Sequence, residues 1–384
     1  MNDKTLESAT PSILEHFHDL DDPRSDINKM HNLNDIITIT ICASICGADK
    51  WTQIADFGSA KRDWLCKILE LPNGIPSHDT FRRVFAKINP ESFHACFQTW
   101  VKSIFSATKG QVVAIDGKTA RRSGNAKSGQ SPLHIVSAWA SENNLLLGQV
   151  KTDEKSNEIT AIPSLLKMLD VAGCIVTIDA MGCQKKIAKQ IVEAKGDYIF
   201  GLKGNQSGLQ DEVKQLFSEL ENGPFDDVEE SHYVTENKGH GRHELREYHV
   251  VKNLGVIGRE VEWPGLQCFA KIISTRIQNE KTSVEERYYI TTLECDAKRF
   301  GQAARSHWSV ENSLHWVLDM AFREDESRTW KDNAPENLAL LNRLTLSLLK
   351  QEKTYKRGIA SKRLRAGWDS KYLELLLTPP QKCA

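Results

Sequence analysis

The stretch QVVAIDGKT, residues 111–119, decides the fold of this chain, because its apolar, largely β-branched run ends in an aspartate, Asp116. Such residues favour strands, and Asp followed by Gly is typical of the point where a strand ends. A second stretch of the same design, CIVTIDAMG at 174–182, ends in Asp179. We therefore predict two buried strands that each present a carboxylate at one edge of a sheet.

Outward from these two strands, the hydrophobic pattern predicts the element order β-β-β-α-β-α-β-α. Three strands joined by turns, followed by strands joined through helices, imply an α/β fold with a mixed sheet and helices on its faces. The predicted strands are 111–117, 132–141, 144–152, 174–180 and 197–203, and the predicted helices are 159–169, 184–194 and 208–221.

The sequence on either side has different hydrophobic patterns. Residues before 109 have helical patterns, 222–294 read as strands and turns, and helical patterns resume from 297 to 350. The predicted regions are a helical N-terminal DNA-binding region (1–108), the first part of the catalytic core (109–221), a β-rich insertion (222–294), a helical end of the core (295–350) and a basic C-terminal tail (351–384).

A third acidic residue, Glu311, lies in the helical stretch HWSVENSLHWVLD at 307–319. On a helical wheel, Glu311 shares a polar face with His315 and Asp319, whereas Val310, Leu314, Val317, Leu318 and Ala321 form an apolar stripe. Two Asp and one Glu at one sheet edge can hold two divalent cations about 3.5–4 Å apart. A solvated polar face is the alternative for Glu311, and the competing third ligands are Glu324, Asp325 and Glu326.

Composition sets broad limits. With 384 residues, of which 40% are hydrophobic and 26% charged, the chain can bury a substantial core. Its formal charge of −1 neither indicates nor excludes a nucleic-acid partner. The nine cysteines form no CxxC pair, which indicates reduced thiols. The N-terminus lacks the pattern of a signal peptide, and the apolar run 36–48 is too short to span a bilayer. We expect a soluble, cytoplasmic protein with no membrane partner.

Several basic and aromatic residues are candidate DNA contacts. Lys118, Arg121 and Arg122 follow the first aspartate, and Lys203 follows the fifth strand, where all four could meet phosphates. The segment GHGRH, 239–243, could form a weak metal site through His240 and His243, or a basic loop that reaches DNA through His240 and Arg242. Trp308 and Trp316 could stack on unpaired bases or serve packing. The GKT at 117–119 lacks the upstream glycine of a P-loop, so an ATPase is disfavoured.

Longer motifs carry a family resemblance over about residues 16–350. They are HNLNDIITITICASICGADKW (31–51), LPNGIPSHDTFRRVF (71–85), AIDGKTARRS (114–123), KGNQ (203–206), KGHGRHELRE (238–247) and HWSVENSLHWVLD (307–319). The chain resembles the H-repeat-associated proteins, which are ISAs-type insertion-sequence transposases of the DDE superfamily. That resemblance implies an RNase H-like fold in which Asp116, Asp179 and Glu311 are the DDE residues and 222–294 is the inserted domain.

The resemblance implies a transposase that cleaves DNA at insertion-sequence ends and joins the 3′-hydroxyl to target DNA with two Mg²⁺ ions, for which Mn²⁺ can substitute. The implied partners are the terminal repeats, the target DNA and a second copy of the chain on DNA, at the nucleoid of a bacterial cytoplasm. The alternatives are a host RNase H-like nuclease, which cleaves without joining, and an inactive DNA-binding relic. Related transposases often carry Tyr, Arg and Lys where this chain has Ala304, His307 and Leu318.

Overall fold

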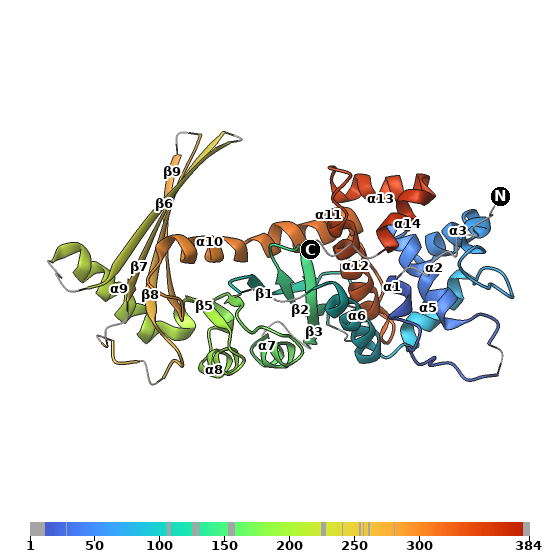
Figure 1. The fold of residues 1–384 in the computed structure, drawn as a ribbon, viewed down its shortest axis with the longest axis horizontal. Coiled ribbons are helices and arrows are strands. Elements are labelled where there is room, and N and C mark those ends of the chain that lie inside the picture. The colour runs from blue at the N-terminus through green and yellow to red at the C-terminus, as the bar shows by residue number, and fades with distance from the viewer. Residues whose placement is uncertain are drawn as a thin grey trace, which may run out of the picture.

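The computed structural model describes residues 12–378, except 28, 106–108, 125–128, 130, 153–157, 224–227, 240, 253–254, 256, 260–261 and 280. The molecule is elongated, with a helical assembly at one end, a sheet in the middle and long antiparallel strands that project at the other end (Figure 1). The helical assembly combines helices from the N-terminal hundred residues with helices that follow residue 333.

One nine-stranded sheet runs through the middle of the molecule and the projecting end, in the order β3-β2-β1-β4-β5-β9-β8-β7-β6. Strand β1 is antiparallel to β2 and parallel to β4, and β4 is parallel to β5. The strands are β1 (Val112–Ala120), β2 (Leu133–Ala140), β3 (Leu145–Thr152), β4 (Ile175–Ile178), β5 (Asp197–Leu202), β6 (Glu230–Gly239), β7 (Arg242–Lys252), β8 (Cys268–Gln278) and β9 (Lys281–Thr291).

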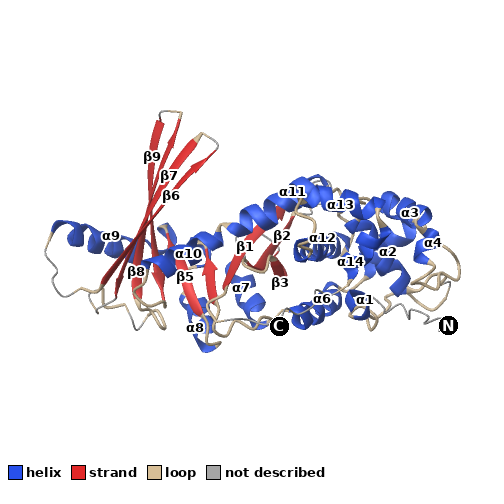
Figure 2. Cartoon of the chain, turned by 45° about the horizontal axis from the view of Figure 1, so that its top comes forward, coloured by secondary structure: helices blue, strands red, loops and turns tan. Residues whose placement is uncertain are grey.

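The predicted order of strands and helices is confirmed, and with it the mixed-sheet α/β fold that the RNase H-like resemblance implied. The β-rich segment extends this sheet, because β9 pairs with β5 and β8, β7 and β6 follow outward (Figure 2). Its hairpins are long ribbons that project beyond the helices.

Helices cover both faces of the sheet. Alternate residues of a strand point to opposite faces. Val112, Ile175 and Ile199 pack in one buried cluster with α10, whereas the next residues in each strand belong to the larger cluster that includes residues of α7 and α8. The sheet-covering helices are α7 (Glu158–Lys167), α8 (Lys185–Glu193), α9 (Ser207–Asn222) and α10 (Ala297–His307).

Two of the N-terminal helices begin at residues whose side chains cap the helix. The Ser77 hydroxyl accepts a hydrogen bond from the Thr80 backbone N–H, and the Asn89 side chain accepts one from the Ser92 N–H at 3.0 Å. Such caps satisfy donors that have no partner within the helix. The N-terminal helices are α1 (Ser12–Glu15), α2 (Leu33–Ile45), α3 (Trp51–Ala60), α4 (Arg62–Leu65), α5 (His78–Lys87) and α6 (Pro90–Ile104).

The apolar run near residue 36 forms α2, which is buried over twelve of its residues, as predicted for a core helix. Among the described residues, no helix combines the length and apolar character needed to cross a membrane. The eight cysteines in the described part of the chain are unpaired, in agreement with the prediction of reduced thiols.

The C-terminal segment differs from the predicted basic tail. It folds into helices that pack on the N-terminal ones, and two of its cations, Lys362 and Arg363, are buried. The Arg363 guanidinium donates to the Ser44 carbonyl and pairs with Asp49 at 2.6 Å. The three helices after residue 333 are α12 (Ala334–Gln351), α13 (Ile359–Trp368) and α14 (Ser370–Leu377). The sequence does not predict this packing, because Arg363 lies 319 residues from Ser44 and 314 residues from Asp49 in the chain.

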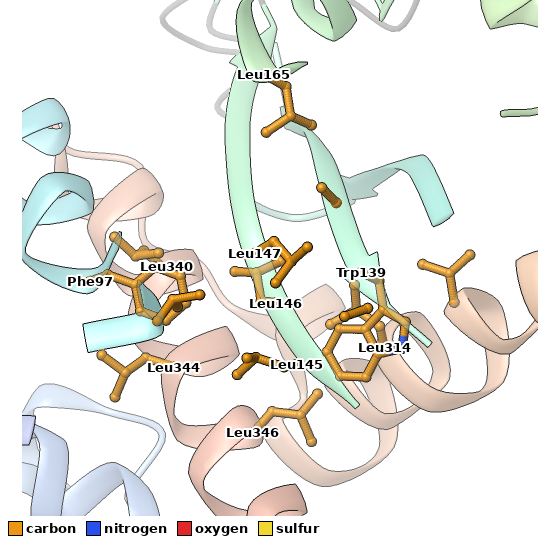
Figure 3. Close-up of a cluster of buried hydrophobic side chains, with 14 of the residues drawn as sticks. Phe97, Trp139, Leu145, Leu146, Leu147, Leu165, Leu314, Leu340, Leu344 and Leu346 are labelled. Atoms are coloured by element: carbon orange, nitrogen blue, oxygen red, sulfur yellow. The ribbon is translucent and has the colours of Figure 1, made fainter. Parts of the chain in front are cut away.

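The helical assembly and the sheet share one core. Leu145 and Leu146 of β3 lie in the same buried cluster as Leu346 of α12, and Trp139 of β2 lies there with Leu314 (Figure 3). Leu314 belongs to a π-helical turn, Glu311–His315, that leads into α11 (Trp316–Phe322). The helix that carries Glu311 is therefore anchored to the sheet by its apolar side.

Candidate functional site

The strand register brings the two aspartates to the same face and edge of the sheet. Ile115 of β1 pairs with Ile178 of β4 in parallel, so Asp116 and Asp179 follow at equivalent positions on neighbouring strands. Neighbouring strands are about 4.8 Å apart, and alternation directs both residues to the face that α10 covers. Thr177 confirms this face, because its hydroxyl contacts His307 Nδ1 of α10 at 3.0 Å.

The third carboxylate arrives on the helix that crosses this face. From α10 the helix continues through Trp308–Val310 into the π-helical turn at Glu311–His315. A π-turn adds a residue to the helix and occurs frequently at functional sites. Leu314 on this turn is fully buried, as the apolar stripe predicted, while the Glu311 side chain remains 56% exposed at the cavity.

His315 joins Asp116 and Glu311 in one cluster. Its Nδ1 lies 3.6 Å from Asp116 Oδ2 and 3.5 Å from Glu311 Oε2, and ligand atoms of all three residues lie within 4.8 Å of one another. The His315 ring is buried, and its Nε2 has no hydrogen-bond partner among the described residues. The sequence placed His315 on the same helix face as Glu311 but gave no sign that it would contact Asp116.

Asp179 completes the carboxylate set from the neighbouring strand. Its Oδ1 accepts hydrogen bonds from the Met181 and Gly182 backbone N–H groups, so it caps the short helix 180–182. This is the turn role considered for an isolated Asp, and it holds the side chain at the strand end. Gly182 permits the tight turn, because a Cβ there would lie 2.2 Å from Ile178 Cγ2.

The electrostatics show a surplus of negative charge at Asp116. The pKa of Asp116 is raised to about 7, chiefly by burial and in addition by the charges of Glu311 and Asp179, while a hydrogen bond from the Gly117 N–H opposes the shift. The hydrogen bond from His315 lowers the pKa of Glu311. Carboxylates crowded in this way favour a bound cation, which stabilises their charged forms.

All three carboxylates line one cavity of about 190 Å³. Exposed Lys203 lines the same cavity, as expected of a residue that follows β5. Arg287 of β9 also lines the cavity, although it was not among the residues predicted from the sequence. Its guanidinium lies 4.4 Å from the centre of the Trp308 ring. Nothing in the local sequence around Arg287 could reveal this, because β9 reaches β5 only through the sheet pairing.

Lys118 is a correction to the predicted DNA contacts. Its side chain is only 8% exposed and its Nζ pairs with the Asp319 carboxylate at 2.7 Å, so it is not available to a phosphate. Alternation along β1 directs Lys118 inward, to the same face as Asp116. Arg121 and Arg122 remain exposed beyond the strand, although Arg121 also pairs with Asp325 at 3.2 Å.

The described candidates in the GHGRH segment, Arg242 and His243, do not line this cavity. Arg242 is exposed at the tip of the β6–β7 hairpin, which projects away from the ends of β1 and β4 (Figures 1 and 2). His243 pairs with Glu236 across that hairpin at 2.6 Å, and His240 lies outside the described residues. Trp308 and Trp316 are both substantially exposed, which is unlike simple core packing.

The competing acidic residues are engaged elsewhere. Glu324 is buried against Arg343 at 2.6 Å, Asp325 pairs with Arg121, and Glu326 pairs with Arg323 at 3.1 Å. None of the three lines the cavity that Asp116 and Asp179 share. Among the described residues, Glu311 is therefore the better placed third carboxylate.

The three positions that differ from related transposases lie in different surroundings. Ala304 and His307 line the cavity, and Leu318 is fully buried. Burial lowers the pKa of His307 while the charge of Asp179 raises it. The positive charge of Lys118 lowers the pKa of Glu311, so a cation from β1 acts near Glu311 although position 318 carries none.

Comparisons with known proteins show which family the chain resembles over most of its length. Residues 107–348 match the family described as transposase DDE domain, and residues 14–101 match the family described as DDE_Tnp_1-associated. The "H repeat-associated putative transposase YhhI" of Escherichia coli K12 is 40% identical over 95% of this chain and 97% of its own length. The "Putative transposase YncI" of Escherichia coli O157:H7 is 40% identical over 95% of this chain and 94% of its own.

A solved structure of a piggyBac transposase synaptic complex with hairpin DNA is a more distant match. It is 11% identical, covers 97% of this chain and 78% of its own, and superposes with a TM-score of 0.42. A likeness at this level has no bearing on the chemistry of the present site.

Proposed function

The chain belongs to the DDE-domain transposase family, with H-repeat-associated relatives, and on that premise we propose that it cleaves DNA at the ends of an insertion sequence and joins the freed 3′-hydroxyl to target DNA. We assign the metal-binding role to Asp116, Asp179 and Glu311. The observation that carries the proposal is that these three residues, brought from β1, β4 and the π-turn, line one cavity.

The residues fit divalent cations with oxygen ligands. Mg²⁺ prefers carboxylates and keeps several waters, and Mn²⁺ also accepts an imidazole such as His315. The raised pKa of Asp116 and the unpartnered Nε2 of His315 both indicate a cluster that lacks a positive charge. Bound cations would activate the attacking oxygen and stabilise the leaving oxygen of a phosphodiester.

The remaining cavity residues orient DNA and the carboxylates. Lys203 and Arg287 place positive charge on the cavity wall facing the carboxylates, where they would hold the backbone of the strand being cut. His315 keeps Glu311 ionised through its hydrogen bond. The buried Lys118–Asp319 pair fixes the helix of Glu311 to β1, so its role is positioning.

A second surface extends the DNA path beyond the carboxylates. A cleft of about 630 Å³ lies beside α11 and is lined by exposed Trp316 and Met320 on one side. The basic residues that line it are Lys350, Lys353, Lys356, Arg357 and Lys362. Burial, and then Lys353 and Lys362, lower the pKa of Lys350 to about 8. Cations crowded in this way favour an anionic ligand, and phosphate with an unpaired base beside Trp316 suits this surface.

We further propose that the helical region within residues 1–108 recognises the terminal repeats, and that two copies of the chain act together on the two element ends. The second proposal follows from the chemistry, since two ends must be brought to one target. A host RNase H-like nuclease would instead cut without joining, and an inactive relic would bind DNA without cutting.

The test uses DNA that carries the element's ends, with Mg²⁺ or Mn²⁺. Asp116→Ala and Asp179→Ala should abolish strand cleavage and joining while DNA binding in a gel-shift assay is retained. Glu193→Ala, an exposed carboxylate on α8, is the matched control and should cleave normally. Equal loss of binding and cleavage in both aspartate variants would show that these residues serve folding instead.

A relic is distinguished by metal binding to the wild-type protein. An intact site should raise the melting temperature when Mn²⁺ is added, because a ligand that binds only the native state stabilises it by mass action. Absence of both cleavage and Mn²⁺-dependent stabilisation would overturn the assignment of an active transposase.

A further inference from the structure

The outer sheet carries a second group of metal-ligand side chains, far along the sheet order from the catalytic cavity. His232 of β6 and His249 of β7 are directly opposed in register, and Glu247 precedes His249 by two residues. The two imidazole rings are 4.5 Å apart between centres, and ligand atoms of all three residues lie within 4.8 Å of one another. Directly opposed cross-strand pairs are close enough for such side chains to interact.

These three side chains share the face of the sheet that α10 does not cover. On β6, the neighbouring Ser231 hydroxyl accepts a hydrogen bond from the Ala297 N–H at the start of α10. On β7, Tyr248 lies in the buried cluster with α10 residues. Since alternate residues point to opposite faces, His232, Glu247 and His249 lie together on the other side.

One of the ligand atoms lacks a partner. His249 Nε2 is buried and has no hydrogen-bond partner in the described part of the chain. Buried polar atoms are rarely left without a partner, so such an atom indicates a missing ligand.

The surrounding charges suit a cation. Glu247 is found in no ion pair among the described residues, and a carboxylate oxygen of it lies with the two imidazoles. A cation, Lys271, is opposite His249 on β8. Its Nζ is paired with Glu221 at 2.9 Å and lies 3.4 Å from Glu286, so two carboxylates already compensate its charge.

We propose that His232, Glu247 and His249 bind one Zn²⁺ ion. Two imidazoles and one carboxylate are a ligand set typical of zinc, with water in the fourth position, whereas Mg²⁺ prefers oxygen ligands alone. Zinc–nitrogen distances of about 2.0–2.1 Å place tetrahedral ligands roughly 3.4 Å apart. Rotation of the exposed His232 side chain can bring the ligands to that spacing.

Such an ion would join the edge strand to the rest of the sheet. β6 is the last strand in the order and pairs only with β7 in the described sheet. A metal bound between them would hold the base of the projecting β6–β7 ribbon while its tip remains free. The site has no residue in common with the catalytic cavity, so it does not depend on the proposed DNA chemistry.

The test measures Zn²⁺ binding to the full-length protein by titration calorimetry, in excess Mg²⁺ to occupy the oxygen-ligand site. We expect one Zn²⁺ per chain, with affinity at least tenfold lower in His232→Ala, Glu247→Gln and His249→Ala. His243→Ala removes a histidine of the same strand that lies outside the cluster, and it should bind as wild type. Asp116→Asn should also retain the ion.

Co²⁺ provides a second readout, because its absorption spectrum in the visible range reports tetrahedral nitrogen and oxygen ligands. The same three variants should lose this spectrum while circular dichroism shows that they are folded. Unchanged Zn²⁺ affinity in all three variants would overturn the proposal. Loss of the ion in Asp116→Asn would also overturn it, since the metal would then be at the catalytic carboxylates.

Discussion

Asp116 is the residue at which burial and charge oppose each other most strongly. Its carboxylate follows a buried strand, contacts His315 and lies near the charges of Glu311 and Asp179. A glycine must follow it, because a Cβ at position 117 would lie 2.4 Å from Glu158 Oε1, in the buried pair that Glu158 forms with His134. The native fold therefore holds a poorly solvated carboxylate at the proposed catalytic centre, at a cost that a bound cation would offset.

Because of this cost, we expect Asp116→Asn to increase the free energy of unfolding of the metal-free protein, by an amount that depends on pH. The native pKa is raised to about 7 from 3.8, so the native state binds the extra proton between these values and the wild type loses stability as pH rises through this window. At pH 8 the variant should be more stable by about 2–4 kcal/mol, since each pKa unit corresponds to about 1.4 kcal/mol. Near pH 4 the difference should vanish.

The measurement is urea unfolding at several pH values in the presence of a chelator. Glu193→Gln, which changes an exposed carboxylate, should show no comparable trend. A gain for Asp116→Asn that is constant from pH 4 to pH 8 would contradict a raised native pKa.

At the scale of elements, α10 determines where the third carboxylate lies. It packs on the sheet through Ala297, Phe300, Ala303 and Ala304, and continues into the π-turn that carries Glu311. Gly301 lets the helix approach β7 closely, because a Cβ there would lie 2.8 Å from the buried Tyr248 ring. The distance between α10 and β7 therefore depends on the absence of a side chain at Gly301.

Gly301→Ala should consequently destabilise the protein. Alanine improves helix propensity by about 1 kcal/mol, but overpacking against a fully buried ring costs about 1–3 kcal/mol, and its near ring atoms cannot rotate away. We expect a net loss in the free energy of unfolding, together with slower cleavage because Glu311 shifts. Gln302→Ala, at the next and exposed position, should show neither effect in thermal unfolding and cleavage assays. A stabilised Gly301→Ala variant would show that the helix is not held this closely.

At the scale of the whole molecule, the two ends of the chain close one helical assembly around α12. Trp64 donates a hydrogen bond to Glu374 at 2.7 Å, and Arg363 joins the ends of α2 and α11 through Ser44, Asp49 and Ala321. The C-terminal segment thus has two roles at different residues. Buried Arg363 stabilises the assembly, whereas exposed Lys353, Lys356 and Arg357 line the cleft beside Trp316.

These two roles predict that one substitution of a basic residue in this segment lowers stability and that another weakens DNA binding. Arg363→Ala leaves Asp49 and two carbonyls without their partner and should lower the free energy of unfolding by about 2–4 kcal/mol. Lys356→Ala changes an exposed side chain, so its stability should stay within about 0.5 kcal/mol. The Lys356→Ala variant should bind DNA more weakly. The slope of the logarithm of its DNA-binding constant against the logarithm of salt concentration should be smaller in magnitude by roughly one.

Urea unfolding and DNA titrations at several salt concentrations separate the two effects. If Lys356→Ala binds DNA with an unchanged salt slope, the cleft does not contact phosphate. An unchanged stability in Arg363→Ala would mean that the contact of the two chain ends contributes little.

The sequence by itself determined the order of strands and helices along the chain from 111 to 221, the position of Asp116 and Asp179 at the ends of two buried strands, and the apolar stripe beside Glu311. These follow from local patterns, namely alternation in strands and helical spacing, which a linear chain displays directly. The family resemblance added the assignment of Glu311.

Only the tertiary structure decided which side chains meet across long separations. It brought His315 to Asp116, Arg287 to the cavity, Lys118 to Asp319, the C-terminal helices to α2, and His232 to His249. Each contact depends on packing between segments that are distant in the chain or on strand register. The physical reason is that local propensity constrains the backbone of one segment, whereas a site needs the relative placement of several, which only the shared core provides.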